Sequence, residues 1–268
     1  MDGSRNDAQG RGMWLAAVIG GVVATLATAL ALAPAQWVVG AVTHVSGGHI
    51  ELAEASGTVW NGSATLVLAP GDARQESRSS LPGQLTWRLA PWPLLLGSVN
   101  LTVQHPAALS APLQLRAHLD GHLQIGAATL RLPAAMLVGL GAPWNTVRPG
   151  GILIVSTDGL DVAAGKIRGS FTGEWEYASS ALTPVSPIGH YRLLTSGPYP
   201  GTRVELETLS GPLELTGSGT IGEGGHLRFE GLARALASAD TATRTQLTGL
   251  ISLLGRREGD AAILDVRT

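Results

Sequence analysis

The chain contains no cysteine among its 268 residues. Disulfide bridges, thiol catalysis and cysteine-ligated zinc sites are therefore excluded. Charge is also scarce, because only 14% of the residues are Asp, Glu, Lys or Arg and the formal net charge is −2. Since no basic surface is available to neutralise phosphates, we expect no nucleic-acid partner.

Charge is completely lacking over residues 12–50. Residues 13–33 are the most apolar part, and at 1.5 Å per residue they make a helix of roughly 30 Å, which matches the hydrocarbon core of a bilayer. Trp14 and Trp37 flank this stretch, and indole rings favour the headgroup layers. The sequence predicts a short N-terminus over residues 1–12, a transmembrane helix over residues 13–35 and a β-rich domain over residues 36–268.

The orientation follows from the flanking charges. Arg11 lies directly before the apolar stretch, and no Lys or Arg follows it until Arg74. The positive-inside rule then predicts a single-pass protein with the short N-terminus in the cytoplasm and the large domain outside it. A cleaved signal peptide is the alternative, because small residues precede Pro34. The length of the apolar run and its barely basic leader favour an uncleaved anchor.

Small residues recur every four positions within the predicted span, at Gly12, Ala16, Gly20, Ala24 and Thr28. Such a stripe lets a second helix approach closely, either from a partner or from another copy of the chain in a homo-oligomer. The general abundance of Gly and Ala explains the stripe equally well.

Beyond residue 50 the dominant pattern is alternation of apolar and polar residues in short segments, which predicts strands with one dry and one wet face. Asp120-Gly121 and Asp158-Gly159 are dipeptides typical of hairpin turns. Short helices are predicted over residues 133–141, opened by proline and closed by glycine, and over residues 240–254, capped by Asp240. The expected strands cover residues 58–68, 84–89, 99–103, 113–125, 128–132, 152–156, 166–177, 191–194, 203–209, 213–221, 226–232 and 261–266.

These elements predict a mostly β fold in which a curved antiparallel meander follows the transmembrane helix. Residues 112–115 (PLQL) resemble residues 212–215 (PLEL), and each copy precedes a glycine turn, another strand and a helical stretch. This echo favours an internal duplication, with chance similarity among meanders as the alternative.

No pattern predicts catalysis, a cofactor site or a metal site. Residues 217–222 fit G-x-G-x-x-G, but a polar glycine-rich stretch follows in place of the helix that a phosphate site needs. His118, Asp120 and His122 surround a turn that leaves only two side chains to converge, with no third ligand in view. We therefore expect a protein that is not an enzyme and that offers binding surface.

The most distinctive stretches are residues 56–64 (SGTVWNGSA) and residues 85–101 (LTWRLAPWPLLLGSVNL). The first predicts a strand that carries Trp60 into an Asn61-Gly62 turn. In the second, Trp87 faces the core beside Trp60, Arg88 points the other way, and prolines mark a corner or an edge of the sheet. The structural residues of this pattern are Gly57, Thr58, Trp60, Gly62, Trp87 and Pro91.

A membrane helix followed by these two stretches resembles the type II secretion system protein N family. The resemblance implies a single-pass protein of the bacterial inner membrane with its bulk in the periplasm. It also implies a non-enzymatic accessory of the bacterial secretion machinery that binds inner-membrane platform or pseudopilus proteins. In architecture the pattern also resembles AsmA-like envelope proteins, whose long curved sheets carry an apolar groove. That likeness supplies the alternative hypothesis of a lipid-binding or lipid-transfer module.

Overall fold

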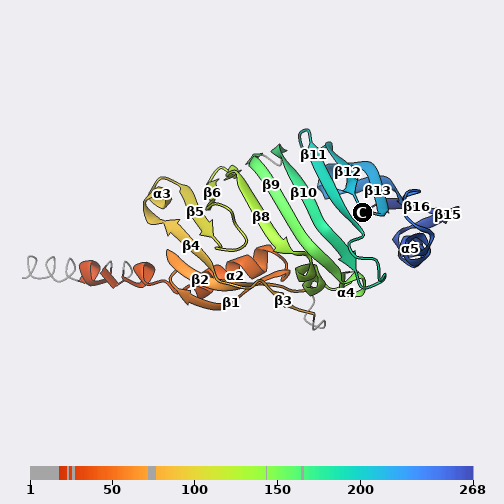
Figure 1. Cartoon of the computed structure of the whole chain (residues 1–268). Helices are drawn as coiled ribbons and strands as arrows, with labels where there is room; N and C mark the ends of the chain where they lie inside the picture. The colour runs from red at the N-terminus through yellow and green to blue at the C-terminus, as the bar shows by residue number, and fades with distance from the viewer. Residues whose placement is uncertain are drawn as a thin grey trace, which may run out of the picture.

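The computed structural model describes residues 18–22, 24–25, 28–71, 77–142, 144–163 and 166–267. Its strands form one 16-stranded antiparallel sheet in the order β1-β2-β4-β5-β6-β7-β9-β10-β11-β12-β13-β14-β16-β15, with β3 beside β2 and β8 beside β9 (Figure 1). Sequential strands are neighbours almost throughout, so the predicted mostly β antiparallel meander is confirmed. The strands are β1 (Ile50–Gly57), β2 (Asn61–Leu68), β3 (Ser79–Ser80), β4 (Leu85–Ala90), β5 (Ser98–Gln104), β6 (Leu113–His118), β7 (Leu123–Ile125), β8 (Ala128–Pro133), β9 (Pro149–Ala163), β10 (Lys166–Ser180), β11 (Gly189–Ser196), β12 (Thr202–Ser210), β13 (Leu213–Ile221), β14 (Leu227–Ala235), β15 (Arg256–Glu258) and β16 (Ala261–Arg267).

Strand pairing gathers the apolar residues of successive strands on one side of the sheet. Leu89 of β4 lies opposite Leu101 of β5, which lies opposite Leu115 of β6, and the series continues through Ile125 of β7 to Leu160 of β9. Because side chains alternate between the two faces of a strand, the intervening polar residues point to the other side. The sheet therefore has an apolar face and a polar face.

Short helices and loops cover the apolar face in three places. The helical elements are α2 (Gln36–Val45), α3 (Pro91–Leu95), the 3-10 helix η1 (Ala134–Leu140), α4 (Trp144–Val147), η2 (Glu223–Gly225) and α5 (Thr241–Leu254). Val38, Val39 and Val42 of α2 pack over the first strands, Met136 of η1 packs over β2 and β8, and α5 packs over β11, β13, β14 and β16. Figure 1 shows α2 beside β1 and β2 and α5 at the other end of the molecule.

The two predicted helices are present. Residues 134–140 form η1, which is a tighter 3-10 helix, and α5 begins after Asp240, whose carboxylate accepts a hydrogen bond from the backbone N–H of Thr243. Leu247, Leu250 and Ile251 are the buried residues of α5, as its apolar periodicity predicts. Helices α2, α3 and α4 were not predicted, because their apolar residues lack a clear 3.6-residue period over such short lengths.

Two predicted turns are wrong. Asn61 and Gly62 begin β2, and the chain reverses one step earlier, at residues 58–60. Asp158 and Gly159 lie inside β9, at the point where its partner changes from β8 to β7. Gly159 has φ of +132°. A left-handed glycine serves an irregularity inside a strand as well as it serves a turn, so the dipeptide alone does not distinguish the two.

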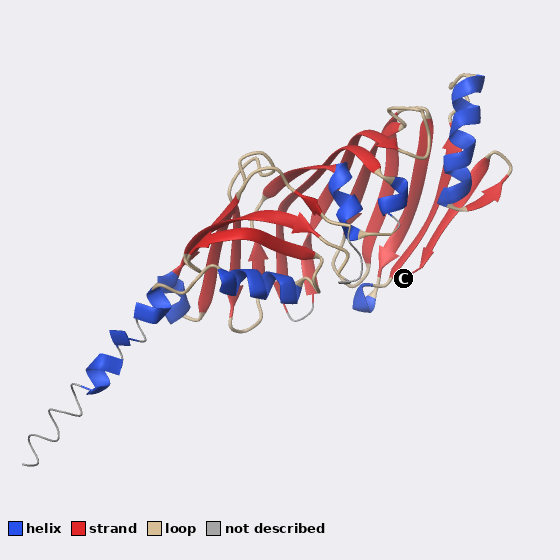
Figure 2. Ribbon diagram, turned by 90° about the horizontal axis from the view of Figure 1, so that it is seen from below, coloured by secondary structure: helices blue, strands red, loops and turns tan. Residues whose placement is uncertain are grey.

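The N-terminal prediction falls partly outside the described residues. Residues 18–22, 24–25 and 28–31 are helical, whereas residues 1–17, 23 and 26–27 are not described. Within the described ranges, no helix has both the length and the apolar character needed to cross a bilayer. In Figure 2 the described helical residues run out from the end of the molecule opposite α5.

Tyr191 lies in the core beneath α5, and its substitution tests how that core is stabilised. Its side chain is 3% exposed, and its hydroxyl donates to the backbone oxygen of Leu213 over 2.9 Å. Burial raises the pKa of this hydroxyl. We expect Tyr191→Phe to lower the free energy of unfolding by about 1–2 kcal/mol, because a buried carbonyl loses its partner. Urea titration of the full chain in detergent, followed by tryptophan fluorescence, measures this loss.

Tyr177→Phe is the matched control, because Tyr177 is 71% exposed. Its unfolding midpoint should equal that of the wild type. Equal midpoints for both variants would show that the Tyr191 hydroxyl contributes nothing to the core.

Candidate functional site at the leader junction and on the polar face

The residues before Pro34, called the leader below, end in a junction with the sheet. The backbone N–H of Val59 donates to the oxygen of Ala33 over 2.9 Å, and that of Ala35 donates to the oxygen of Gly57 over 3.2 Å. Ala33 and Ala35 are 1% and 0% exposed. The last turn of the leader is therefore part of the folded domain, with no free linker between them.

Trp60 connects the leader to β4. Its indole Nε1 donates to the backbone oxygen of Leu30 over 2.9 Å, and its own backbone oxygen accepts from the N–H of Leu89 over 2.7 Å. A chain of two hydrogen bonds thus runs from the leader through the β1–β2 turn to the end of β4.

Trp87 supports the same turn from the apolar face of the sheet. The side chain is 4% exposed, and its Nε1 donates to the backbone oxygen of Val59 over 3.0 Å. The ring lies directly against Gly62, where a Cβ atom would meet Trp87 Cζ2 at 2.3 Å. Glycine is required at this position so that the indole can lie close to β2.

The residues of the sequence pattern meet in this junction or border it. Gly57 ends β1 with φ of +86°, Thr58 forms a β-bridge with Pro34, and Pro91 begins α3. Trp87 is buried as expected, whereas Trp60 lies in the turn and bonds the leader. The sequence could not predict this bond, because nothing in residues 56–64 indicates that the preceding helix end is their partner.

Gly62→Ala should destabilise the junction. The added methyl forces the Trp87 indole out of place, and overpacking of this kind costs about 1–3 kcal/mol. We expect the urea midpoint to fall and the leader to be cleaved faster by protease near residue 33, as measured by mass spectrometry. Gly173→Ala is the control, since a Cβ atom there meets only Leu193 Cβ at an ordinary 3.7 Å. Equal cleavage rates in the two variants would count against the junction.

The polar face carries a ladder of ion pairs across β8, β10, β11 and β12. Arg192 of β11 donates from Nε to Glu174 over 2.9 Å and from Nη1 to Glu207 over 3.1 Å. Arg131 of β8 donates from Nη2 to Glu176 over 3.2 Å. The hydrogen bond from Arg192 lowers the pKa of Glu174, and the same bond raises the pKa of Arg192. Sequence analysis missed this ladder because each pair depends on strand register.

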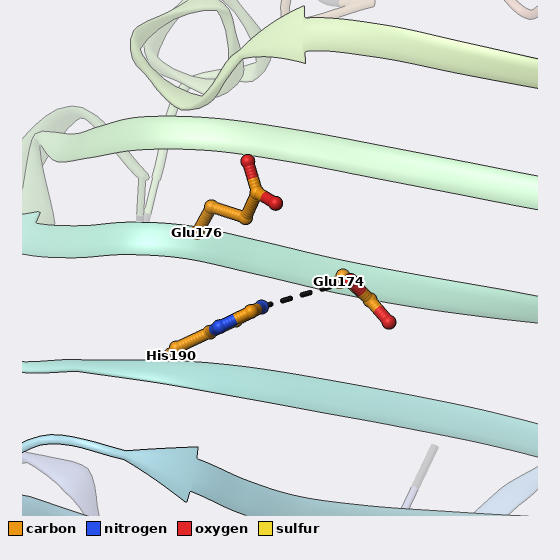
Figure 3. A group of neighbouring side chains, drawn as sticks. All are labelled: Glu174, Glu176 and His190. Atoms are coloured by element: carbon orange, nitrogen blue, oxygen red, sulfur yellow. Dashed lines mark ion pairs between the residues drawn. The ribbon is translucent and has the colours of Figure 1, made fainter.

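Glu174, Glu176 and His190 bring ligand-type atoms within 4.8 Å of one another. In Figure 3 the His190 ring points toward Glu174, while the Glu176 carboxylate points to the strand on the other side. His190 Nε2 lies 3.6 Å from Glu174 Oε2. Both carboxylates already bind arginines, so a cation would have to displace these guanidinium groups. We therefore interpret the cluster as part of the ion-pair ladder.

The ladder predicts an acid-sensitive contribution to stability. A carboxyl group whose pKa is lowered on folding stabilises the native state above its unfolded pKa, and this contribution is lost as the pH falls through the lowered value. Glu174→Gln should therefore reduce the urea midpoint at pH 7, with the difference from wild type closing as the pH falls below 4.5, the ordinary pKa of a glutamate, and through the lowered pKa of Glu174. Glu205→Gln on the neighbouring β12 should not reproduce this convergence. A gap that stays constant with pH would contradict the assigned pairing.

A hollow of about 710 Å³ lies on the polar face over β11 to β16. Leu194, Leu232 and Ile263 contribute apolar side chains to its lining, while Glu205 and Glu230 contribute carboxylates. Protein-binding surfaces commonly combine apolar and polar side chains in this way.

The remaining candidates from the sequence have structural roles. His118 and His122 stack with ring centroids 5.9 Å apart, and His122 Nε2 lies 2.9 Å from Asp161 Oδ1 of β9. This contact lowers the pKa of Asp161. It could not be predicted from the sequence, because Asp161 is distant along the chain. The G-x-G-x-x-G residues lie on β13 and its turn, where Phe229 packs against Gly217.

The stripe of small residues is described only in part. Gly12 and Ala16 lie outside the described residues. Gly20, Ala24 and Thr28 are exposed, and a Cβ atom at Gly20 would meet nothing within 4 Å. The described part of the stripe therefore makes no packing contact with the β-domain at Gly20, and its helix-pairing role stays a prediction.

Comparison with known proteins identifies the family of this chain. Residues 48–263 match the model of the family described as type II secretion system (T2SS), protein N. No curated protein and no solved structure matches the chain. Because the match covers most of the sheet and well over half of the sequence, the chain belongs to the type II secretion system protein N family.

Proposed function

We propose that this protein is a non-enzymatic accessory of the type II secretion machinery, and that it acts as a scaffold. Its β-domain binds other secretion components, which we take to be proteins of the inner-membrane platform or the pseudopilus. The proposal rests on family membership and on one observation, the hollow on a polar face that the covering helices leave open.

The distribution of helices supports the polar face as the binding surface. The buried clusters that involve α2, η1 and α5 all lie on the apolar side of the sheet. The opposite side presents Leu194, Leu232 and Ile263 among charged residues. A partner with apolar side chains flanked by basic residues would complement this surface.

We further propose that residues 13–35 anchor the protein in the inner membrane, with residues 36–268 in the periplasm. The uncharged stretch over residues 12–50 and the single preceding Arg11 support this topology. The junction at residues 30–35 supports it as well, because it fixes the end of the leader to the sheet without a linker.

The lipid-binding hypothesis takes second place. A lipid-carrying sheet needs a continuous apolar channel, whereas packing under α2, η1 and α5 occupies the apolar face at intervals. A photoactivatable phospholipid that crosslinked to the apolar face of the sheet, and not only to the leader or the exposed turns, would reverse this order.

The scaffold hypothesis is tested by photo-crosslinking in cells at native expression. A benzoylphenylalanine introduced at Ser218, which lines the hollow, should crosslink to a secretion-system protein. The same reporter at Ser110, exposed on the 105–112 segment, is the control and should not. Leu232→Glu should weaken the crosslink and reduce release of secreted proteins by several-fold, because it replaces an apolar side chain that lines the hollow with a carboxylate.

Three results would count against the scaffold. The first is equal crosslinking from both positions, and the second is normal secretion with Leu232→Glu. The third is unimpaired secretion in a strain that lacks the protein.

A further inference from the structure

A cluster of exposed apolar side chains projects from the hairpin ends beside β4, β5 and β6. It consists of Trp92, Leu94, Leu95, Leu96 and Leu119, called the leucine tip below. Among the described large apolar residues, five are more than three-quarters exposed, and four of these belong to the tip: Trp92 at 77%, Leu95 at 77%, Leu96 at 87% and Leu119 at 89%, the fifth being Val45 at 86%.

Two separate turns build this tip as one surface. Trp92, Leu94 and Leu95 lie on α3, between β4 and β5, whereas Leu119 lies in the turn between β6 and β7. The backbone N–H of Leu119 donates to the oxygen of Gly97 over 3.1 Å. A Cβ atom at Gly97 would meet Leu119 Cδ1 at 3.0 Å, so the leucine packs across the glycine.

The tip is joined to the end of the leader. Trp60 bonds Leu30 of the leader with its side chain and Leu89 with its backbone oxygen. Leu89 lies two residues before Pro91, where α3 begins. Figure 1 shows α3 and the leader at the same end of the molecule.

The chemistry of the tip suits a bilayer surface. No Asp, Glu, Lys or Arg lies between Arg88 and Arg116. The N–H groups of Leu96 and Gly97 donate to the oxygens of Pro93 and Leu94, so the turn satisfies its own backbone groups before entering a medium without water. Trp and Leu are the residues that interfacial segments bury at the headgroup boundary.

We propose that the leucine tip inserts into the periplasmic leaflet of the membrane that holds the leader, and so makes a second contact with lipid. This inference rests on the proposed anchor, because the anchor fixes where the bilayer lies. Arg88 and Arg116, both exposed at the borders of the uncharged stretch, would then reach the lipid phosphates. Asp120 follows Leu119, and its carboxylate accepts a hydrogen bond from the backbone N–H of His122 within the turn.

The absence of cysteine permits a direct test on the full chain. Leu95→Cys, Leu119→Cys, Val22→Cys and Leu253→Cys each give a single spin-labelling site at an exposed residue, so folding is preserved. The proteins are reconstituted into vesicles of phosphatidylethanolamine and phosphatidylglycerol. Collision with oxygen and with a nickel chelate then measures whether each label is in lipid or in water.

We expect the labels at 95 and 119 to collide with the nickel chelate several-fold less often than the label at 253, which lies at the far end on α5. The label at 22 reports the anchor independently. Suppose that the label at residue 22 is in lipid while the labels at residues 95 and 119 collide with the chelate as often as the label at residue 253. The tip then does not bind lipid and the inference is overturned. This outcome includes the case in which a protein covers the tip in the cell. If the label at residue 22 also collides with the chelate as often as the label at residue 253, the proposed anchor is wrong, and the inference is wrong with it.

Discussion

The structure depends on the need of a single-layered sheet to keep one face away from water. Its strands carry most of their large apolar side chains on one face, and no second sheet lies over that face in the described chain. Three elements pack on this face and cover it: α2 near the N-terminus, the 105–112 segment with η1 in the middle, and α5 at the end. Each covers only part of the sheet, so the long sheet has several small cores in place of one large core.

This arrangement assigns different tasks to the two faces. The apolar face determines stability, as Tyr191 and Trp87 illustrate with buried rings whose polar atoms are bonded to backbone oxygens. The polar face holds the strands in register through pairs such as Glu174 and Arg192. Such pairs are partly exposed and contribute little energy individually, yet they are compatible with a surface that also meets other proteins.

Much of the fold could be predicted, and the failures have definite causes. Period-two alternation identified most strands, and Asp240 with the leucines that follow it identified α5. The Asp158-Gly159 dipeptide led to the wrong prediction of a hairpin turn, because the same backbone geometry occurs in a turn and in an irregularity within β9. The sequence singles out the six residues of the Trp60–Trp87 pattern, but it does not predict the hydrogen bond from Trp60 to Leu30, since this bond joins a turn to a helix end 30 residues away. The ion-pair ladder was equally hidden, because it exists only once strand register is known.

The clamped end of the leader has a mechanical consequence. In proteins with a flexible tether, the domain tumbles independently of its anchor. Here hydrogen bonds at Ala33, Ala35 and Leu30 join the leader directly to the sheet. If the leader anchors the protein as we propose, a tilt or axial rotation of its helix would be passed on to the sheet, and a neighbouring helix that reorients the leader could move the distant α5 end without touching it.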